Sequence, residues 1–332
     1  MTFKFNNVYL NNTATITGPM ESDGPLSKYF DKSYKEYYMG TSTWEDAEIR
    51  LMNEAIEKVL EKEQINKNQI DLFISGDLSN QIASSNYTAS NLSIPYLGIY
   101  SACATSIEGL ILASILVENN NVSKVLTSTA SHNNLSEKTF RYPVEYGGPK
   151  RKTATFTTTG SAAAIVSNNK SDIKITSATI GTSIDSGVKD VYNMGGVMAI
   201  AAAKSIYKHL TDLKRDANYY DLILTGDLGI VGKDILREYM QVEYNIELNN
   251  LDDSACMIFD IDNQSVYSGG SGPACLPLVS YSYIIDKMRN KKYKRVLLVG
   301  TGALMNVSMV NLKNTIPSIS HVISLEVSDD IS

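Results

Sequence analysis

The sequence has few cysteines, and their spacing argues against two kinds of architecture. Cys103, Cys256 and Cys275 are the only three, they lie far apart, and none belongs to a C-x-x-C pair. An odd number of widely spaced cysteines favours neither a disulfide framework nor a zinc site. We therefore expect free thiols and a reducing compartment.

Long apolar runs and a basic surplus are also lacking. The N-terminus, MTFKFNN, has no apolar stretch typical of a signal peptide, and no apolar run reaches the roughly eighteen residues of a membrane-spanning helix. If the protein works at a membrane, we expect it to do so peripherally. The net charge is −6 and there is no long basic block. Nucleic acid is therefore not expected as a partner, because binding to its phosphates needs positive surface.

The remaining composition is typical of a globular protein with a large core. Hydrophobic residues make up 43% and charged residues 20% of 332 residues. Strand-like and helix-like segments alternate, which favours parallel pairing in an α/β sheet. We expect strands at 8–17, 70–75, 95–99, 122–130, 161–167, 173–180, 221–225, 295–302 and 319–327, with the 95–99 strand buried, and helices near 43–63, 79–92, 105–118, 194–210, 235–240 and 275–289.

The order of these segments repeats. Residues 71–78, DLFISGDL, match residues 221–228, DLILTGDL, at five of eight positions. The turn around Cys103 corresponds in position to the glycine-rich turn at 269–272. Duplication predicts two similar halves, 1–170 and 171–332, around a pseudo-twofold axis, with the two turns facing one another and a site between them.

Two segments are candidates for that site. Cys103 lies between a strand and a helix, where free backbone N–H groups and the helix dipole can lower a thiol pKa or bind an anion. The alternative is that Cys103 is a small core residue, since free cysteine packs as a small hydrophobe. Residues 131–160 interrupt the first half with aromatic, basic and glycine residues, and we interpret them as a binding loop or a solvated insertion.

A cysteine at a strand-to-helix elbow in one half and a glycine-rich elbow in the other resembles the thiolase and ketoacyl-synthase fold. That fold has two βαβαβαββ halves in an αβαβα arrangement of layers. Within it, the sequence is similar to the stage V sporulation protein AD family at GPL (24–26), SGDL (75–78), SHN (131–133), FRYP (140–143), EYGG (145–148), LTGDL (224–228) and GGSG (269–272).

The resemblance implies a protein that binds dipicolinic acid, alone or as its calcium chelate, during loading of the developing spore and release at germination. It implies no other cofactor and no metal site. It further implies integral membrane proteins of the same sporulation system as partners, and a peripheral position on the cytoplasmic face of the forespore membrane. Folds of this kind often form homodimers through the first-half sheet edge, and the residues leave that open.

Catalysis is not expected. Condensing enzymes of this fold support their cysteine with a histidine after the strand equivalent to 221–225 and an asparagine or second histidine near the glycine-rich elbow. Here the two loops read Thr225-Gly226-Asp227 and Gly270-Ser271-Gly272 and offer neither group. Two alternatives stay open: a condensing enzyme that acylates Cys103, and a structural scaffold that binds no small molecule.

A planar dianion needs a slot for its ring and donors for two carboxylates. The predicted ligand-binding residues are Cys103 as a polarizable wall, His132 and Ser271 as polar contacts, Arg141 as a bidentate donor, Tyr142 or Tyr146 beside the ring, and Asp227.

Asp77 and Asp227 are also candidates to hold calcium carried in with the ligand. The alternative role for both is to cap the turn that follows a strand. The other two histidines, His209 and His321, are expected to be structural or exposed.

Overall fold

One strand order occurs twice in the chain. In the computed structural model, which describes residues 1–140 and 150–328, the first set runs β2-β8-β6-β4-β5 and the second β9-β14-β13-β10-β11. The first set consists of β2 (Tyr9–Thr17), β4 (Leu72–Gly76), β5 (Tyr96–Gly98), β6 (Lys124–Ser131) and β8 (Gly160–Ser167). The second consists of β9 (Ile173–Thr179), β10 (Leu222–Thr225), β11 (Leu251–Asp253), β13 (Arg295–Ala303) and β14 (Ser318–Val327). The predicted duplication is confirmed by this repeated order, whereas the boundary at residue 170 stays a prediction.

The direction of pairing repeats as well. The strand β4 runs parallel to β5 and β6, and β10 runs parallel to β11 and β13. In each set one strand, β8 or β14, pairs antiparallel with both of its neighbours. The two sets join where β2 and β9 pair antiparallel at Tyr9–Lys174 and Leu10–Ile173. Parallel strands need long crossovers, which explains the helices between them.

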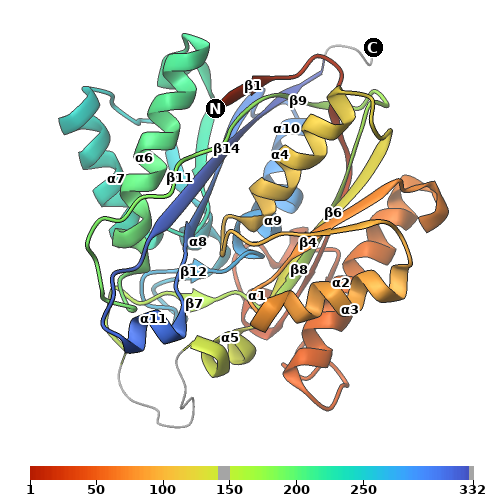
Figure 1. Ribbon diagram of the computed structural model, residues 1–332, viewed down its shortest axis with the longest axis horizontal. Helices are drawn as coiled ribbons and strands as arrows, with labels where there is room; N and C mark the ends of the chain where they lie inside the picture. Colours follow the sequence, from red (N-terminus) through yellow and green to blue (C-terminus); the bar gives the residue numbers. More distant parts are fainter. Residues whose placement is uncertain (141–149, 329–332) are drawn as a thin grey trace.

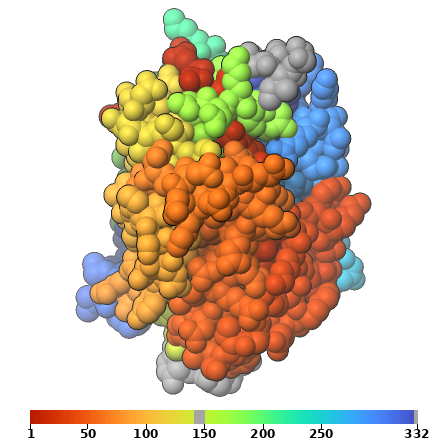
Figure 2. Space-filling view, turned by 90° about the vertical axis from the view of Figure 1, so that its right-hand side faces the viewer, coloured from red at the N-terminus to blue at the C-terminus, as the bar shows by residue number. Residues whose placement is uncertain are grey.

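Helices form three layers around the two sets of strands, which we call the first and the second sheet (Figure 1). The outer face of the first sheet is covered by α2 (Trp44–Glu63) and α3 (Ala83–Leu92), which occupy much of the surface in Figure 2. The outer face of the second is covered by α6 (Met194–Leu213) and α7 (Gly229–Tyr244). Between the sheets lie α4 (Thr105–Glu118) and the continuous helix α9 (Cys275–Val279), η6 (Ser280–Ile284) and α10 (Ile285–Arg289). The predicted α/β fold with αβαβα layers is confirmed.

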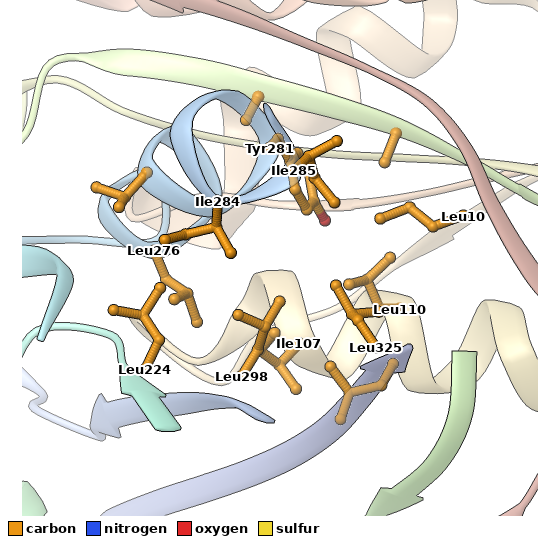
Figure 3. Packing of buried hydrophobic residues seen from close by; sticks show 14 of the residues in the cluster. Leu10, Ile107, Leu110, Leu224, Leu276, Tyr281, Ile284, Ile285, Leu298 and Leu325 are labelled. Atoms are coloured by element: carbon orange, nitrogen blue, oxygen red, sulfur yellow. The ribbon is translucent and has the colours of Figure 1, made fainter. Parts of the chain in front are cut away.

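The sequence of each helix fits its layer. The helix α4, TSIEGLILASILVE, is apolar on nearly all sides, as expected for a helix buried between two sheets. Figure 3 shows Ile107 and Leu110 of α4 facing Leu276 and Ile284 across this middle layer. By contrast, α2 buries one face, and the Thr43 Oγ1 at its start accepts the Asp46 N–H at 3.1 Å. The predicted helix start at residue 43 is therefore confirmed.

One prediction about a strand is wrong. The strand β5 was expected to be buried, yet it pairs only with β4 within the described sheet, and the Leu97 side chain is 45% exposed. Its position as the last strand of its set explains the exposure.

The remaining elements are short. They are β1 (Thr2–Lys4), α1 (Pro19–Ser22), η1 (Ser27–Tyr29), β3 (Lys32–Ser33), η2 (Lys67–Gln69), η3 (Asn80–Ile82), α5 (Asn133–Phe140), β7 (Phe156–Thr157), η5 (Ala217–Tyr219), α8 (Ser254–Ile258), β12 (Gly270–Ser271) and α11 (Val307–Asn311). None of the described helices combines the length and the apolar character needed to cross a bilayer.

Candidate functional site

The two halves meet at a tight elbow just before α4. Ala102 has a φ of 50°, a backbone conformation that non-glycine residues adopt infrequently, and Cys103 follows it with 7% of its surface exposed. The end of β13 approaches this elbow closely, because a Cβ placed on Gly302 would lie 2.2 Å from the Ser101 carbonyl oxygen. Glycine at 302 thus allows the second half to pack against the cysteine turn.

The carboxylate of Asp227 lies beside the Cys103 thiol. It follows β10 in the second half and accepts hydrogen bonds from Thr301 Oγ1 at 2.6 Å and the Gly272 N–H at 3.3 Å. The Cys103 thiol interacts with the same carboxylate, and each group shifts the pKa of the other. Asp227 therefore interacts with both the cysteine turn and the glycine-rich turn. This agrees with the prediction that the two turns face one another.

This pairing keeps the thiol protonated. Burial raises the pKa of the Cys103 thiol well above its usual value, and the negative charge of Asp227 raises it further. Burial also raises the pKa of Asp227 to about 7, although the hydrogen bonds from Cys103 and Thr301 oppose the rise. A thiol beside a carboxylate is a poor nucleophile, since the thiolate is the reactive form.

A pocket opens at Cys103. Its cavity volume is about 30 Å³, close to the volume of one water molecule, so a larger ligand must also occupy the space that opens beside it. Its walls are largely apolar, with two aromatic rings and a few hydroxyls: Leu78, Tyr100, Ala102, Cys103, Ser136, Phe140, Thr157, Met194, Ser271, Ala303 and Met305. An outer groove shares Leu78, Tyr100, Phe140 and Met305 with it and also contains Lys138 and Glu45.

One hydroxyl of the pocket has no partner. Ser136 Oγ of α5 is buried and makes no hydrogen bond to any other atom of the described chain. A buried donor without a partner costs free energy, so its presence at the wall of a pocket points to a ligand atom that it can bind.

The structure brings three of the predicted ligand-binding residues together. Cys103 and Ser271 line the same pocket, and Asp227 contacts Cys103 beneath it. Arg141, Tyr142 and Tyr146 lie outside the described residues, although Phe140, which directly precedes Arg141, lines the pocket. Whether any of these residues binds a ligand stays a prediction.

His132 lies elsewhere. Its Nε2 is 2.8 Å from the Tyr37 carbonyl oxygen, its Nδ1 accepts the Leu135 N–H at 3.4 Å, and its ring stacks near Trp44. Burial lowers its pKa. These contacts hold the start of α5 against the loop before α2, and His132 is not among the residues that line the pocket.

The other polar candidates have structural partners. Both Asp77 oxygens accept hydrogen bonds from the backbone N–H groups and hydroxyls of Ser79 and Ser85. These bonds correspond to the alternative role of Asp77, which is to cap the turn after its strand. His209 bonds to Thr179 and Tyr220, and His321 lies between Ser101 and the Gly181 N–H. Residues 1–140 and 150–328 contain no cluster of three or more acidic, histidine or cysteine side chains placed to hold a metal ion.

Sequence reasoning missed Thr301 and Ser136. Thr301 lies between Gly300 and Gly302, at the end of β13 that meets the elbow, and a strand ending in alternating glycines was the available signal. Ser136 has no such signal, because only the packing of α5 against the pocket places it there.

Three comparisons place the chain among known proteins. Residues 1–326 match the family model for stage V sporulation protein AD. A relative of that name from Bacillus subtilis (strain 168) is 44% identical over 319 residues, which covers 96% of this chain and 94% of the relative. Among solved structures, 3-oxoacyl-[acyl-carrier-protein] synthase III from Aquifex aeolicus VF5 has a TM-score of 0.60 at 14% identity and covers 96% of this chain and 99% of its own.

A Xanthomonas campestris OleA variant with bound lauric acid and lauroyl-CoA has a TM-score of 0.57 at 13% identity, covering 96% of this chain and 99% of its own. At this level of identity, the likeness to both structures shows the fold.

Proposed function

Because the chain belongs to the stage V sporulation protein AD family, we propose that it binds dipicolinic acid, alone or as its calcium chelate, in the pocket at Cys103. In this proposal it serves the sporulation system that moves this compound into the spore and releases it at germination. It does so beside integral membrane proteins, at the periphery of the forespore membrane.

The observation that carries the proposal is the unpartnered hydroxyl of Ser136 in an otherwise apolar pocket. Tyr100 and Phe140 line both the pocket and the outer groove and can offer their rings to a flat aromatic acid, and a carboxylate is the kind of acceptor that Ser136 lacks. The hydroxyl of Ser271 lines the opposite elbow and offers a second polar contact. Hydrogen bonds to a charged acceptor are stronger than hydrogen bonds between neutral groups.

The state of the cysteine supports binding over catalysis. A condensing enzyme needs a thiolate and a general base, yet the pKa of Cys103 lies well above its usual value because of burial and Asp227. An aspartate beside the sulfur disfavours the anion that acyl transfer requires. Cys103 therefore serves in this proposal as a neutral wall of the pocket.

The test is calorimetric titration with dipicolinate, with and without calcium, on the unmodified protein and on Ser136→Ala. Loss of one hydrogen bond to a charged acceptor weakens binding by about 10-fold or more. Folding stability should not fall, because Ser136 Oγ has no protein partner among the described residues. The matched control is Ser177→Ala, which removes another buried, unpartnered hydroxyl on β9 and should leave the affinity unchanged.

The alternatives give different results. A covalent acyl adduct on Cys103 with an acyl-thioester donor would identify a condensing enzyme. No heat with dipicolinate in either condition would contradict the proposal and favour a scaffold. Equal affinity of Ser136→Ala and the unmodified protein would remove this pocket from consideration.

A further inference from the structure

We propose that a basic and aromatic surface, far from the Cys103 pocket, docks the protein on an anionic lipid bilayer. We define this basic surface by six cations and three tyrosines near the turn between α10 and β13. They are Lys28, Lys287, Arg289, Lys291, Lys292 and Lys294, with Tyr29, Tyr283 and Tyr293.

The density of cations here is unusual for this chain. Residues 287–295 read KMRNKKYKR and contain six basic side chains, although the whole protein has a net charge of −6. The corresponding turn of the first half, residues 119–124 between α4 and β6, reads NNNVSK and contains one. The two halves share one strand order, so the fold itself does not require cations at this turn.

Most of these charges are not neutralised within the described chain. Lys287 pairs with Asp286 at 3.0 Å, and Arg289 pairs with Asp172 at 2.7 Å. Asp221 accepts the backbone N–H groups of 294 and 295, and Glu326 lies opposite Arg295 in the pairing of β13 with β14. For Lys28, Lys291, Lys292 and Lys294, no ion pair occurs within residues 1–140 and 150–328, and all four are exposed.

The tyrosines favour lipid over an acidic protein or nucleic acid. The rings of Tyr29 and Tyr283 meet edge to face at 5.0 Å, and Lys287 Nζ lies 5.0 Å from the centroid of each. Lys292 Nζ lies 5.6 Å from the Tyr293 ring. All three tyrosines are partly exposed. Tyrosine is enriched at the headgroup level of bilayers, and clusters of four to eight Lys or Arg bind anionic lipid.

The position of this surface leaves the pocket free. Arg295 begins β13 beside the basic surface, and Ala303 at the other end of the same strand lines the Cys103 pocket. A nine-residue strand spans about 26 to 30 Å. In Figure 1, α10 lies toward the top, whereas α5 and α11 lie toward the bottom. Docking through the basic surface would therefore direct the pocket away from the bilayer.

The test measures partition of the full chain onto vesicles of phosphatidylglycerol and phosphatidylcholine by sedimentation. We expect binding to mixed vesicles that falls as salt is added, and no binding to pure phosphatidylcholine. Each lysine near an anionic surface contributes about a 5-fold change in affinity, so Lys291→Gln, Lys292→Gln and Lys294→Gln together should weaken partition about 100-fold.

The matched control is Lys67→Gln, Lys204→Gln and Lys313→Gln, which makes the same change in net charge on other exposed surfaces. Lys313 has a φ of 64° and Lys291 a φ of 59°, so each triple variant replaces one lysine that lies in the left-handed backbone region. The control should bind as the unmodified protein does.

Absence of binding to phosphatidylglycerol vesicles would overturn the proposal. Equal weakening by the two triple variants would also overturn it, because binding would then follow net charge alone. Dipicolinate affinity of the same variants should be unchanged, so failure of this proposal is distinguishable from failure of the proposed ligand site.

Discussion

Replacement of Asp227 by asparagine should remove a pH dependence from the folding stability of the protein. Asp227 is 1% exposed, and burial raises its pKa from the usual 3.8 to about 7. Between these two values the unfolded chain releases the proton while the folded chain retains it. Folding stability from this group is therefore fully present below about pH 4 and is lost as the pH rises to about 7.

The size of the effect follows from the two pKa values. Each pKa unit corresponds to about 1.4 kcal/mol, so the gap between 3.8 and about 7 amounts to about 4 kcal/mol. Asparagine has nearly the same shape and stays neutral, so it lacks this dependence. The free energy of unfolding of Asp227→Asn, minus that of the unmodified protein, should rise by about 4 kcal/mol between pH 4 and pH 8.

Urea denaturation at a series of pH values measures this difference, with the single tryptophan, Trp44, as the fluorescent probe. The difference reports Asp227 together with its interaction with Asp253, because the charge of Asp253 contributes to the raised pKa of Asp227. Asp253→Asn offers a graded comparison, since burial raises the pKa of Asp253 to about 6 and the expected rise is about 3 kcal/mol. A difference that is flat, or that falls with pH, would refute the reasoning.

Two further predictions test the elbow. Iodoacetamide should not label Cys103 in the folded protein at pH 8, because burial and Asp227 raise the thiol pKa well above its usual value; rapid labelling found by mass spectrometry would contradict this and support the enzyme alternative. Gly302→Ala should lower the free energy of unfolding by about 1 to 3 kcal/mol, since its Cβ would meet the Ser101 carbonyl at 2.2 Å. The control is Gly109→Ala in α4, where the nearest atom to the added Cβ is an Ile99 methyl carbon at 3.4 Å, so its free energy of unfolding should stay equal or rise. If both variants lower the free energy of unfolding equally, the close approach at Gly302 is not the cause.

Much of the fold could be predicted because the signals are local. The apolar runs of the strands and the all-apolar face of α4 follow from side-chain periodicity, and the match between 71–78 and 221–228 exposes the duplication. The one strand predicted with the wrong environment, β5, has an apolar sequence but lies at an edge. Strand order depends on contacts between distant segments, which no local pattern records.

Sequence by itself determined the layered α/β fold, the Cys103 elbow and the absence of an imidazole in the loops opposite it. Only the tertiary structure decided that Asp227 contacts Cys103, that Thr301 bonds to Asp227, and that Ser136 lines the pocket. The physical reason is that each of these contacts joins residues of different strands or helices, far apart in sequence. Burial then sets the protonation of the thiol and the carboxylate, and burial is a property of the packed chain.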